Sequence, residues 1–202
     1  MTGVSEARRL CVFAGSRSGC DPAFVAAARS LGGAVAARGL ELVYGGGSTG
    51  LMGEVAAGCL DAGGTVIGVV PRELFHDDQL DPGLSRVITT AGMHERKLRM
   101  TELASAFAVL PGGYGTLDET FEAITWQQLG LHHKPLGFLD VSGFFTPLLA
   151  WLEQLSQLGF VGLTCPRPLC EADPEALLAR LYGPNIPHSL SARTRGKAPL
   201  VP

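Results

Sequence analysis

The feature that most constrains the fold is a regular alternation of short apolar runs with longer amphipathic stretches. Each run has the length of a buried strand, ends near glycine, serine or proline, and is followed by apolar residues at helical spacing. Strands that alternate with helices in this way form a parallel sheet that is covered on both faces. We therefore predict a doubly wound, Rossmann-like α/β fold in a single domain, for which 202 residues, 46% of them hydrophobic, supply enough core.

The predicted elements divide the chain into one domain and a short tail. Predicted strands cover residues 10–14, 40–44, 65–70, 86–89, 106–110, 135–139 and 168–171. Predicted helices cover residues 22–38, 49–62, 93–104, 116–129, 143–157 and 174–182. From residue 183 onward the sequence has basic residues but no acidic residues and no apolar periodicity. We expect residues 1–182 to form the domain and residues 183–202 to form a flexible C-terminal tail.

Charge and composition exclude several classes of protein. The net charge of −3 provides no basic field for nucleic acid. No apolar run reaches the roughly 18 residues of a membrane span, and the first residues do not have the pattern of a signal peptide. The five cysteines form no CxxC pair, and no His, Asp or Glu cluster has the spacing of metal ligands. We therefore expect a cytoplasmic protein with reduced thiols, no metal site and no membrane contact.

A glycine-rich loop, YGGGSTGLMG at residues 44–53, follows the second predicted strand. It contains a formal GxGxxG match, but a dinucleotide fingerprint belongs after the first strand and needs an acidic residue about 20 positions later, at the end of the next strand. Here the next strand ends in Val69, Val70 and Pro71. The pattern GxxxxGK[ST] is also absent from the sequence. These residues predict neither NAD binding nor a P-loop ATPase.

A second glycine-rich loop, PGGYGTLDE at residues 111–119, lies between a predicted strand and a predicted helix. Its glycines allow the backbone to approach an anion closely, and the helix that Thr116 opens points free N–H groups at that spot. This arrangement predicts a phosphate-binding site. Thr116 and Glu119 also have the spacing of a capping box, in which Glu119 would only cap the helix. The residues alone leave both interpretations open.

Two adjacent cations, Arg96 and Lys97, stand in the first turn of the third predicted helix. The positive end of the helix dipole disfavours cations at that position. A ligand that carries negative charge would compensate for them. Solvated surface charge is the alternative interpretation.

Together these motifs resemble the LOG ("Lonely guy") family of cytokinin riboside 5′-monophosphate phosphoribohydrolases. The family's PGGxGTxxE motif matches residues 111–119, its MHxRK element residues 93–97 and its YGGGxxGLMG stretch residues 44–53. Residues 121–130 and 134–135 continue the match, so the resemblance covers about residues 10–182. It implies hydrolysis, without a cofactor, of the N-glycosidic bond of a nucleoside 5′-monophosphate. The base would be an N6-prenylated adenine, with AMP also cleaved.

The resemblance also implies roles for individual residues, with Arg96 and Glu119 as the catalytic pair. Glu119 would stabilise positive charge on the ribose or activate water, and Arg96 would hold Glu119 or stabilise the departing base. In the loop after the third strand, Asp78 is the best match to an acidic substrate-binding residue, ahead of Glu73. The family is dimeric or hexameric, which implies an assembly of identical chains, and we expect a homodimer. The other implied substrate contacts are Gly46, Gly47, Lys97, Gly112, Gly113, Tyr114, Gly115, Thr116 and Thr125.

Three other functions remain as alternatives. An AMP nucleosidase for nucleotide salvage would perform the same hydrolysis on AMP. A non-enzymatic nucleotide or molybdenum-cofactor carrier would use the glycine loops without needing Arg96 and Glu119 together. A lysine decarboxylase, a label often attached to this family, would need a lysine that forms a Schiff base with pyridoxal phosphate. The lysines are only three, at positions 97, 134 and 197, and the chain is short for such an enzyme.

Overall fold

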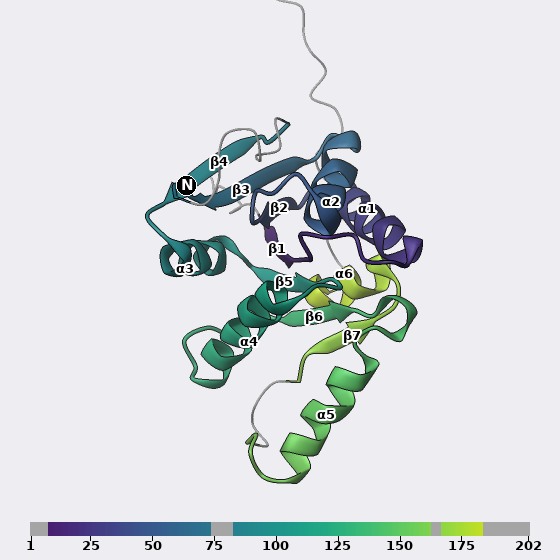
Figure 1. The fold of residues 1–202 in the computed structure, drawn as a ribbon, viewed down its shortest axis with the longest axis vertical. Helices are drawn as coiled ribbons and strands as arrows, with labels where there is room; N and C mark the ends of the chain where they lie inside the picture. The colour runs from purple at the N-terminus through teal and green to yellow at the C-terminus, as the bar shows by residue number, and fades with distance from the viewer. Residues whose placement is uncertain (1–7, 74–82, 163–166, 184–202) are drawn as a thin grey trace, which may run out of the picture.

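A seven-stranded parallel sheet forms the centre of the molecule, with strand order β4-β3-β2-β1-β5-β6-β7 (Figure 1). The computed structural model describes residues 8–73, 83–162 and 167–183. The strands are β1 (Arg9–Phe13), β2 (Glu41–Tyr44), β3 (Thr65–Pro71), β4 (Arg86–Thr90), β5 (Ala106–Val109), β6 (Leu136–Leu139) and β7 (Leu169–Glu171). The helices are α1 (Pro22–Ala37), α2 (Gly50–Asp61), α3 (Met93–Leu103), α4 (Tyr114–Gln128), the short 3₁₀ helix η2 (Val141–Gly143), α5 (Thr146–Gln157) and α6 (Pro174–Tyr182).

The helices cover both faces of the sheet. Helices α1, α2 and α6 pack on one face, and α3, α4 and α5 lie on the other (Figure 1). Successive residues of a strand point to opposite faces, so Leu10 and Val12 of β1 join the first core while Cys11 and Phe13 join the second. The predicted doubly wound α/β fold is confirmed.

Local sequence accounts for where several helices begin. Asp21 and Asp173 precede α1 and α6, and each side chain accepts a hydrogen bond from a backbone N–H of the first turn. A proline follows each aspartate, where its fixed φ suits the start of a helix and its missing N–H costs no hydrogen bond.

No helix in the part of the chain that the structure describes is long and apolar enough to cross a membrane.

Each predicted strand and helix is present, and most of their ends differ from the prediction by one or two residues. The largest difference is at α5, which begins at Thr146 instead of residue 143. Residues Val141–Gly143 form a 3₁₀ turn in which Ser142 and Gly143 have left-handed φ values of 54° and 72°. This conformation cannot continue into an α-helix, so the helix begins after it.

Helices α1 and α2 approach so closely that glycine is required at the contact. A Cβ atom at Gly32 would overlap the Val55 carbonyl oxygen, and one at Gly58 would overlap the Arg29 carbonyl oxygen. Gly33, the next residue along α1, has more room, because the nearest atom to its Cβ position, the Gly58 carbonyl oxygen, is 3.9 Å away. The two neighbouring glycines therefore have different structural roles.

We expect Gly32→Ala to destabilise the protein by about 1–3 kcal/mol, because the added methyl group must push α1 and α2 apart. The matched variant Gly33→Ala adds the same atom without a clash and should stabilise the protein by about 0.5–1 kcal/mol through helix propensity. Urea denaturation measures both free energies of unfolding. Equal unfolding midpoints for the two variants would contradict the close contact.

Candidate active site at the carboxyl edge of the sheet

A cavity of about 590 Å³ lies where the loops after β1 and β5 meet. The strand order reverses at this point, because β1 lies between β2 and β5. Ligands of open parallel sheets bind at such crevices beyond the carboxyl ends of the strands. The two loops contact each other directly, since the Gly15 N–H donates to the Pro111 carbonyl at 3.0 Å. The first turns of α3 and α4 complete the wall of the cavity.

The loop after β5 presents the N-terminus of α4 to this cavity. Gly112 has to be a glycine, since a Cβ atom there would overlap the Thr116 side chain. Gly113 is the N-cap residue of α4, and it supplies no side-chain cap. The first N–H groups of a helix have no carbonyl partner within that helix. The loop therefore offers the cavity a set of backbone donors at the positive end of a helix dipole.

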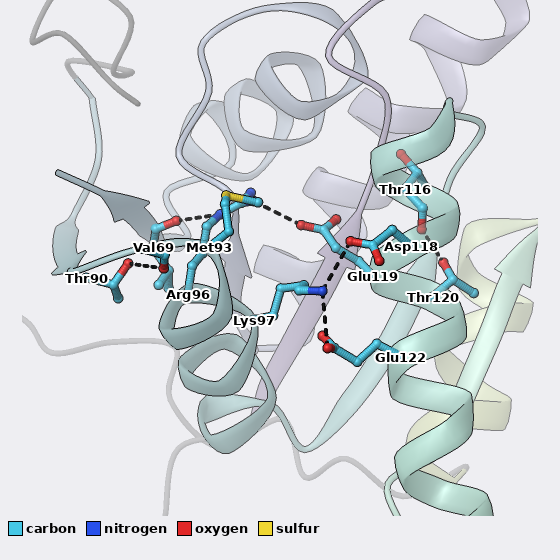
Figure 2. A network of polar contacts seen from close by, with 11 residues as sticks. Val69, Thr90, Met93, Arg96, Lys97, Thr116, Asp118, Glu119, Thr120 and Glu122 are labelled. Carbon is cyan, nitrogen blue, oxygen red and sulfur yellow. Dashed lines mark hydrogen bonds and ion pairs between the residues drawn. The ribbon is translucent and has the colours of Figure 1, made fainter. Parts of the chain in front are cut away.

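The structure contradicts the capping-box interpretation of Thr116 and Glu119. Helix α4 begins at Tyr114, two residues earlier than predicted, so Thr116 lies inside the first turn and is 4% exposed. The N-cap position is occupied by Gly113. The Glu119 carboxylate is directed towards α3 and pairs with Arg96 (Figure 2).

Arg96 and Glu119 form a buried ion pair between α3 and α4 (Figure 2). The Arg96 Nη1 atom lies 3.1 Å from Glu119 Oε1, and the two side chains are 8% and 11% exposed. Arg96 Nε also donates to the Val69 carbonyl of β3 at 3.1 Å. A Cβ atom at Gly45 would overlap the guanidinium, so the end of β2 packs against it. The pair lines the cavity and is held by parts of the sheet and by both helices.

Lys97 links the same two helices. Its ammonium lies 3.2 Å from an Asp118 carboxylate oxygen and 3.1 Å from a Glu122 carboxylate oxygen (Figure 2). Carboxylates of α4 thus compensate both cations in the first turn of α3. The adjacent positive charges do not require a bound ligand to explain them, and they are not solvated surface charge, because both side chains are largely buried.

The electrostatic environment raises the pKa of Glu119 above its ordinary value. Burial is the main cause, and the negative charges of Asp118 and Glu122 act in the same direction. The positive charges of Arg96 and Lys97 oppose these effects and lower the pKa. A carboxyl group with a raised pKa that faces a cavity is typical of a catalytic acid or base.

The structure brings together most of the residues that the sequence pointed to. Arg96, Glu119 and the loop residues Gly112, Gly113, Tyr114, Gly115 and Thr116 all line the cavity. Gly46, Gly47 and Lys97 are not among the lining residues, and Thr125 lines a second cavity of about 560 Å³ beside α4 and α5. Asp78 lies outside the described residues.

We did not predict from the sequence that the loop after β1 would be part of the site. Residues 15–19 line the cavity, and among them Arg17 adds a second arginine. The signal that could have found this loop is its position, because it follows the strand at which the order of the sheet reverses. Within residues 8–73, 83–162 and 167–183, no group of three His, Cys, Asp or Glu side chains is placed to hold a metal ion.

Known proteins resemble this chain over most of its length. A family model described as "Possible lysine decarboxylase" matches residues 52–180. The Oryza sativa subsp. japonica protein named cytokinin riboside 5′-monophosphate phosphoribohydrolase LOG is 40% identical over 200 residues, which cover 93% of this chain and 83% of that protein. The Arabidopsis thaliana protein named cytokinin riboside 5′-monophosphate phosphoribohydrolase LOG2 is 42% identical over 183 residues, covering 91% and 86%.

Solved structures share the fold at lower sequence identity. The molybdenum cofactor binding protein from Rippkaea orientalis has a TM-score of 0.66 at 20% identity, covering 87% of this chain and 96% of that one. The Moco carrier protein from Chlamydomonas reinhardtii has a TM-score of 0.63 at 23% identity, covering 87% and 99%. At these identities the likeness shows the fold alone.

The charges around Glu119 predict opposite effects of two substitutions. Lys97→Met removes a nearby positive charge and should raise the pKa of Glu119, whereas Glu122→Gln removes a negative charge and should lower it. Carboxyl-detected NMR titration of the protein measures both shifts. Glu102→Gln is the control, because Glu102 pairs with Arg99 and is not among the groups that affect Glu119. Shifts of the same sign for the first two variants would contradict this account.

Proposed function

The chain belongs to the LOG family of cytokinin riboside 5′-monophosphate phosphoribohydrolases, and on this basis we propose that its carboxyl-edge cavity is where it hydrolyses the N-glycosidic bond of such nucleotides. The products are a free adenine-type base and ribose 5-phosphate. The observation that carries the proposal is the buried Arg96–Glu119 pair, which faces a cavity that also contains the N-terminus of α4.

The 5′-phosphate binds at the loop formed by residues 112–116. Backbone N–H groups at a helix N-terminus bind phosphate because they are unpaired donors at the positive end of the helix dipole. Gly113 and Gly115 have no neighbouring atom within 4 Å of their Cβ positions, so the space above the backbone is open for the phosphate. Binding energy from the phosphate fixes the ribose, which places C1′ near the ion pair.

Glu119 is the residue that acts on the reacting bond. As the bond between C1′ and the base breaks, its electron pair leaves with the base and positive charge develops on the ribose. The Glu119 carboxylate stabilises this charge and accepts a proton from the water that attacks C1′. The base takes up a proton from solvent as it leaves, and Glu119 returns the proton of the attacking water to solvent, so that water is added across the broken bond. Arg96 holds the carboxylate in place and favours its ionised form.

Pyridoxal phosphate, which the description "Possible lysine decarboxylase" implies, does not fit this cavity. Its chemistry needs a lysine that can form a Schiff base. Lys97 is held by two carboxylates, and Lys134 donates to the carbonyls of Thr101 and Glu102. Neither of them lines the cavity, and Lys197 lies outside the described residues. A role as a nucleotide or molybdenum-cofactor carrier rests only on the shared fold. It would not explain why the Arg96–Glu119 pair faces the cavity.

The proposed assembly is a homodimer formed through the region of α4 and α5. In the part of the chain that the structure describes, α5 has no buried residue. Leu129, Leu131 and Phe160 are 68%, 69% and 77% exposed, and Trp151 is 51% exposed. Apolar side chains exposed in this number around one region are typical of a protein interface.

We also propose a cytoplasmic location, which is supported by the described cysteines, because they are all free thiols.

Light scattering during size-exclusion chromatography should give twice the chain mass of 21.2 kDa. We expect Phe160→Glu to shift the protein towards the monomer, because a charge would be buried at the interface. Val87→Glu is the control, since Val87 is exposed on the distant edge strand β4. A monomeric wild type would contradict the proposed assembly.

Chromatographic measurement of released base tests the proposed reaction. The wild-type protein should release adenine from AMP and isopentenyladenine from isopentenyladenosine 5′-monophosphate, with faster release from the prenylated nucleotide. Release from AMP alone would make the chain an AMP nucleosidase. Binding of both nucleotides without release of either base would contradict the hydrolase.

The matched variant for this assay is Glu119→Gln, which keeps a hydrogen-bond acceptor for Arg96 but removes the negative charge. Turnover should fall by about 10²–10⁴-fold, while the dissociation constant for AMP stays nearly unchanged. Hydrolysis of AMP by this variant at the wild-type rate would contradict the role of Glu119.

A further inference from the structure

We propose that Arg17, on the loop between β1 and α1, binds the 5′-phosphate of the substrate and makes the cavity select nucleotides over nucleosides. The inference rests on the proposed function, and it adds a cationic contact that the glycine loop alone does not supply. Arg17 lies outside the motifs at residues 44–53, 93–97 and 111–119.

Arg17 shares the cavity with the N-terminus of α4. Residues 15–19 line one part of the wall, and residues 111–116 line another. The two loops are joined by the hydrogen bond from Gly15 to Pro111. A Cβ atom at Gly15 would lie 3.2 Å from the Cα atom of Gly112, which shows how closely the two backbones pass. A phosphate on the α4 N-terminus is therefore bound in the same cavity as Arg17.

Arg17 is available to a ligand, whereas the other nearby cations are already paired. Arg96 is buried and committed to Glu119 and to the Val69 carbonyl. Lys97 is committed to two carboxylates of α4 and does not line the cavity. Arg17 is exposed and forms no ion pair with any residue in the described ranges. Of the three cations Arg17, Arg96 and Lys97, Arg17 is therefore the one whose charge is available to a phosphate dianion.

The backbone that carries Arg17 is held in place by the start of α2. The Thr49 hydroxyl donates to the Ser16 carbonyl at 3.3 Å, and the Met52 N–H donates to the Gly15 carbonyl at 3.2 Å. Gly50 has a left-handed φ of 62°, and a Cβ atom there would overlap the backbone of Ser16 and Arg17. The first glycine-rich loop therefore acts here as a support for the loop that carries Arg17.

The chemistry of the two partners is complementary. A guanidinium can form two parallel hydrogen bonds to phosphate oxygens, while the α4 N–H groups bind the remaining oxygens. A nucleoside has a neutral 5′-hydroxyl and gains little from this arrangement. Arg17 should therefore affect the binding of every ligand that carries the 5′-phosphate and leave the binding of the free base unchanged.

Steady-state kinetics of Arg17→Gln test the inference. The KM for AMP should rise by about tenfold to a hundredfold, the range expected for loss of a charge-assisted hydrogen bond, with little change in kcat. Inhibition by ribose 5-phosphate should weaken by the same factor, while inhibition by adenine stays unchanged. Arg86→Gln is the control, because it removes the same charge from an exposed residue at the start of β4, outside the cavity.

A wild-type KM for AMP in Arg17→Gln would overturn the inference. Equal weakening of inhibition by ribose 5-phosphate and adenine would overturn it as well, because general damage to the cavity would then be the cause. Calorimetric titration of wild type and variant with ribose 5-phosphate separates this inference from the proposed reaction. Weaker binding to the variant supports the role of Arg17 even if no nucleotide is hydrolysed, and equal binding contradicts it.

Discussion

The ion pair between Arg96 and Glu119 is the interaction on which the arrangement of the site depends. Its two charges are almost fully withdrawn from water, and such a pair is stable only when both partners keep each other and their other hydrogen bonds. The Val69 carbonyl, the backbone at Gly45 and the Lys97 contacts with α4 all restrict where the two side chains can lie. The site is therefore built into the contact between α3, α4 and the sheet.

The groups that line the cavity suit the two charges of a nucleotide that undergoes glycosidic cleavage. Arg17 and the N-terminus of α4 both line it, and we propose that they bind the 5′-phosphate. The Glu119 carboxylate also lines the cavity, and we propose that it stabilises the positive charge that develops on the ribose. On this proposal, positive groups of the cavity hold the phosphate of the substrate, and a carboxylate stabilises the cationic transition state.

The sequence predicted the fold well because each strand and helix has a clear local periodicity and ends near a glycine, serine or proline. It also pointed to Arg96, Glu119 and the loop at residues 112–116, which the structure brings to one cavity. It did not predict that Lys97 pairs with Asp118 and Glu122, because these contacts join two different helices and depend on how α3 and α4 pack. The interpretation of Thr116 and Glu119 as a capping box was wrong, because α4 begins after Gly113, which supplies no side-chain cap.

A crystal structure of the Glu119→Gln variant with AMP would show where the nucleotide lies, because the variant should bind it without cleaving it. We expect an intact nucleotide with its phosphate at residues 112–116 and its C1′ atom facing residues 96 and 119. A nucleotide bound with its ribose away from these two side chains would contradict the assignment of the Arg96–Glu119 pair as the site of glycosidic cleavage.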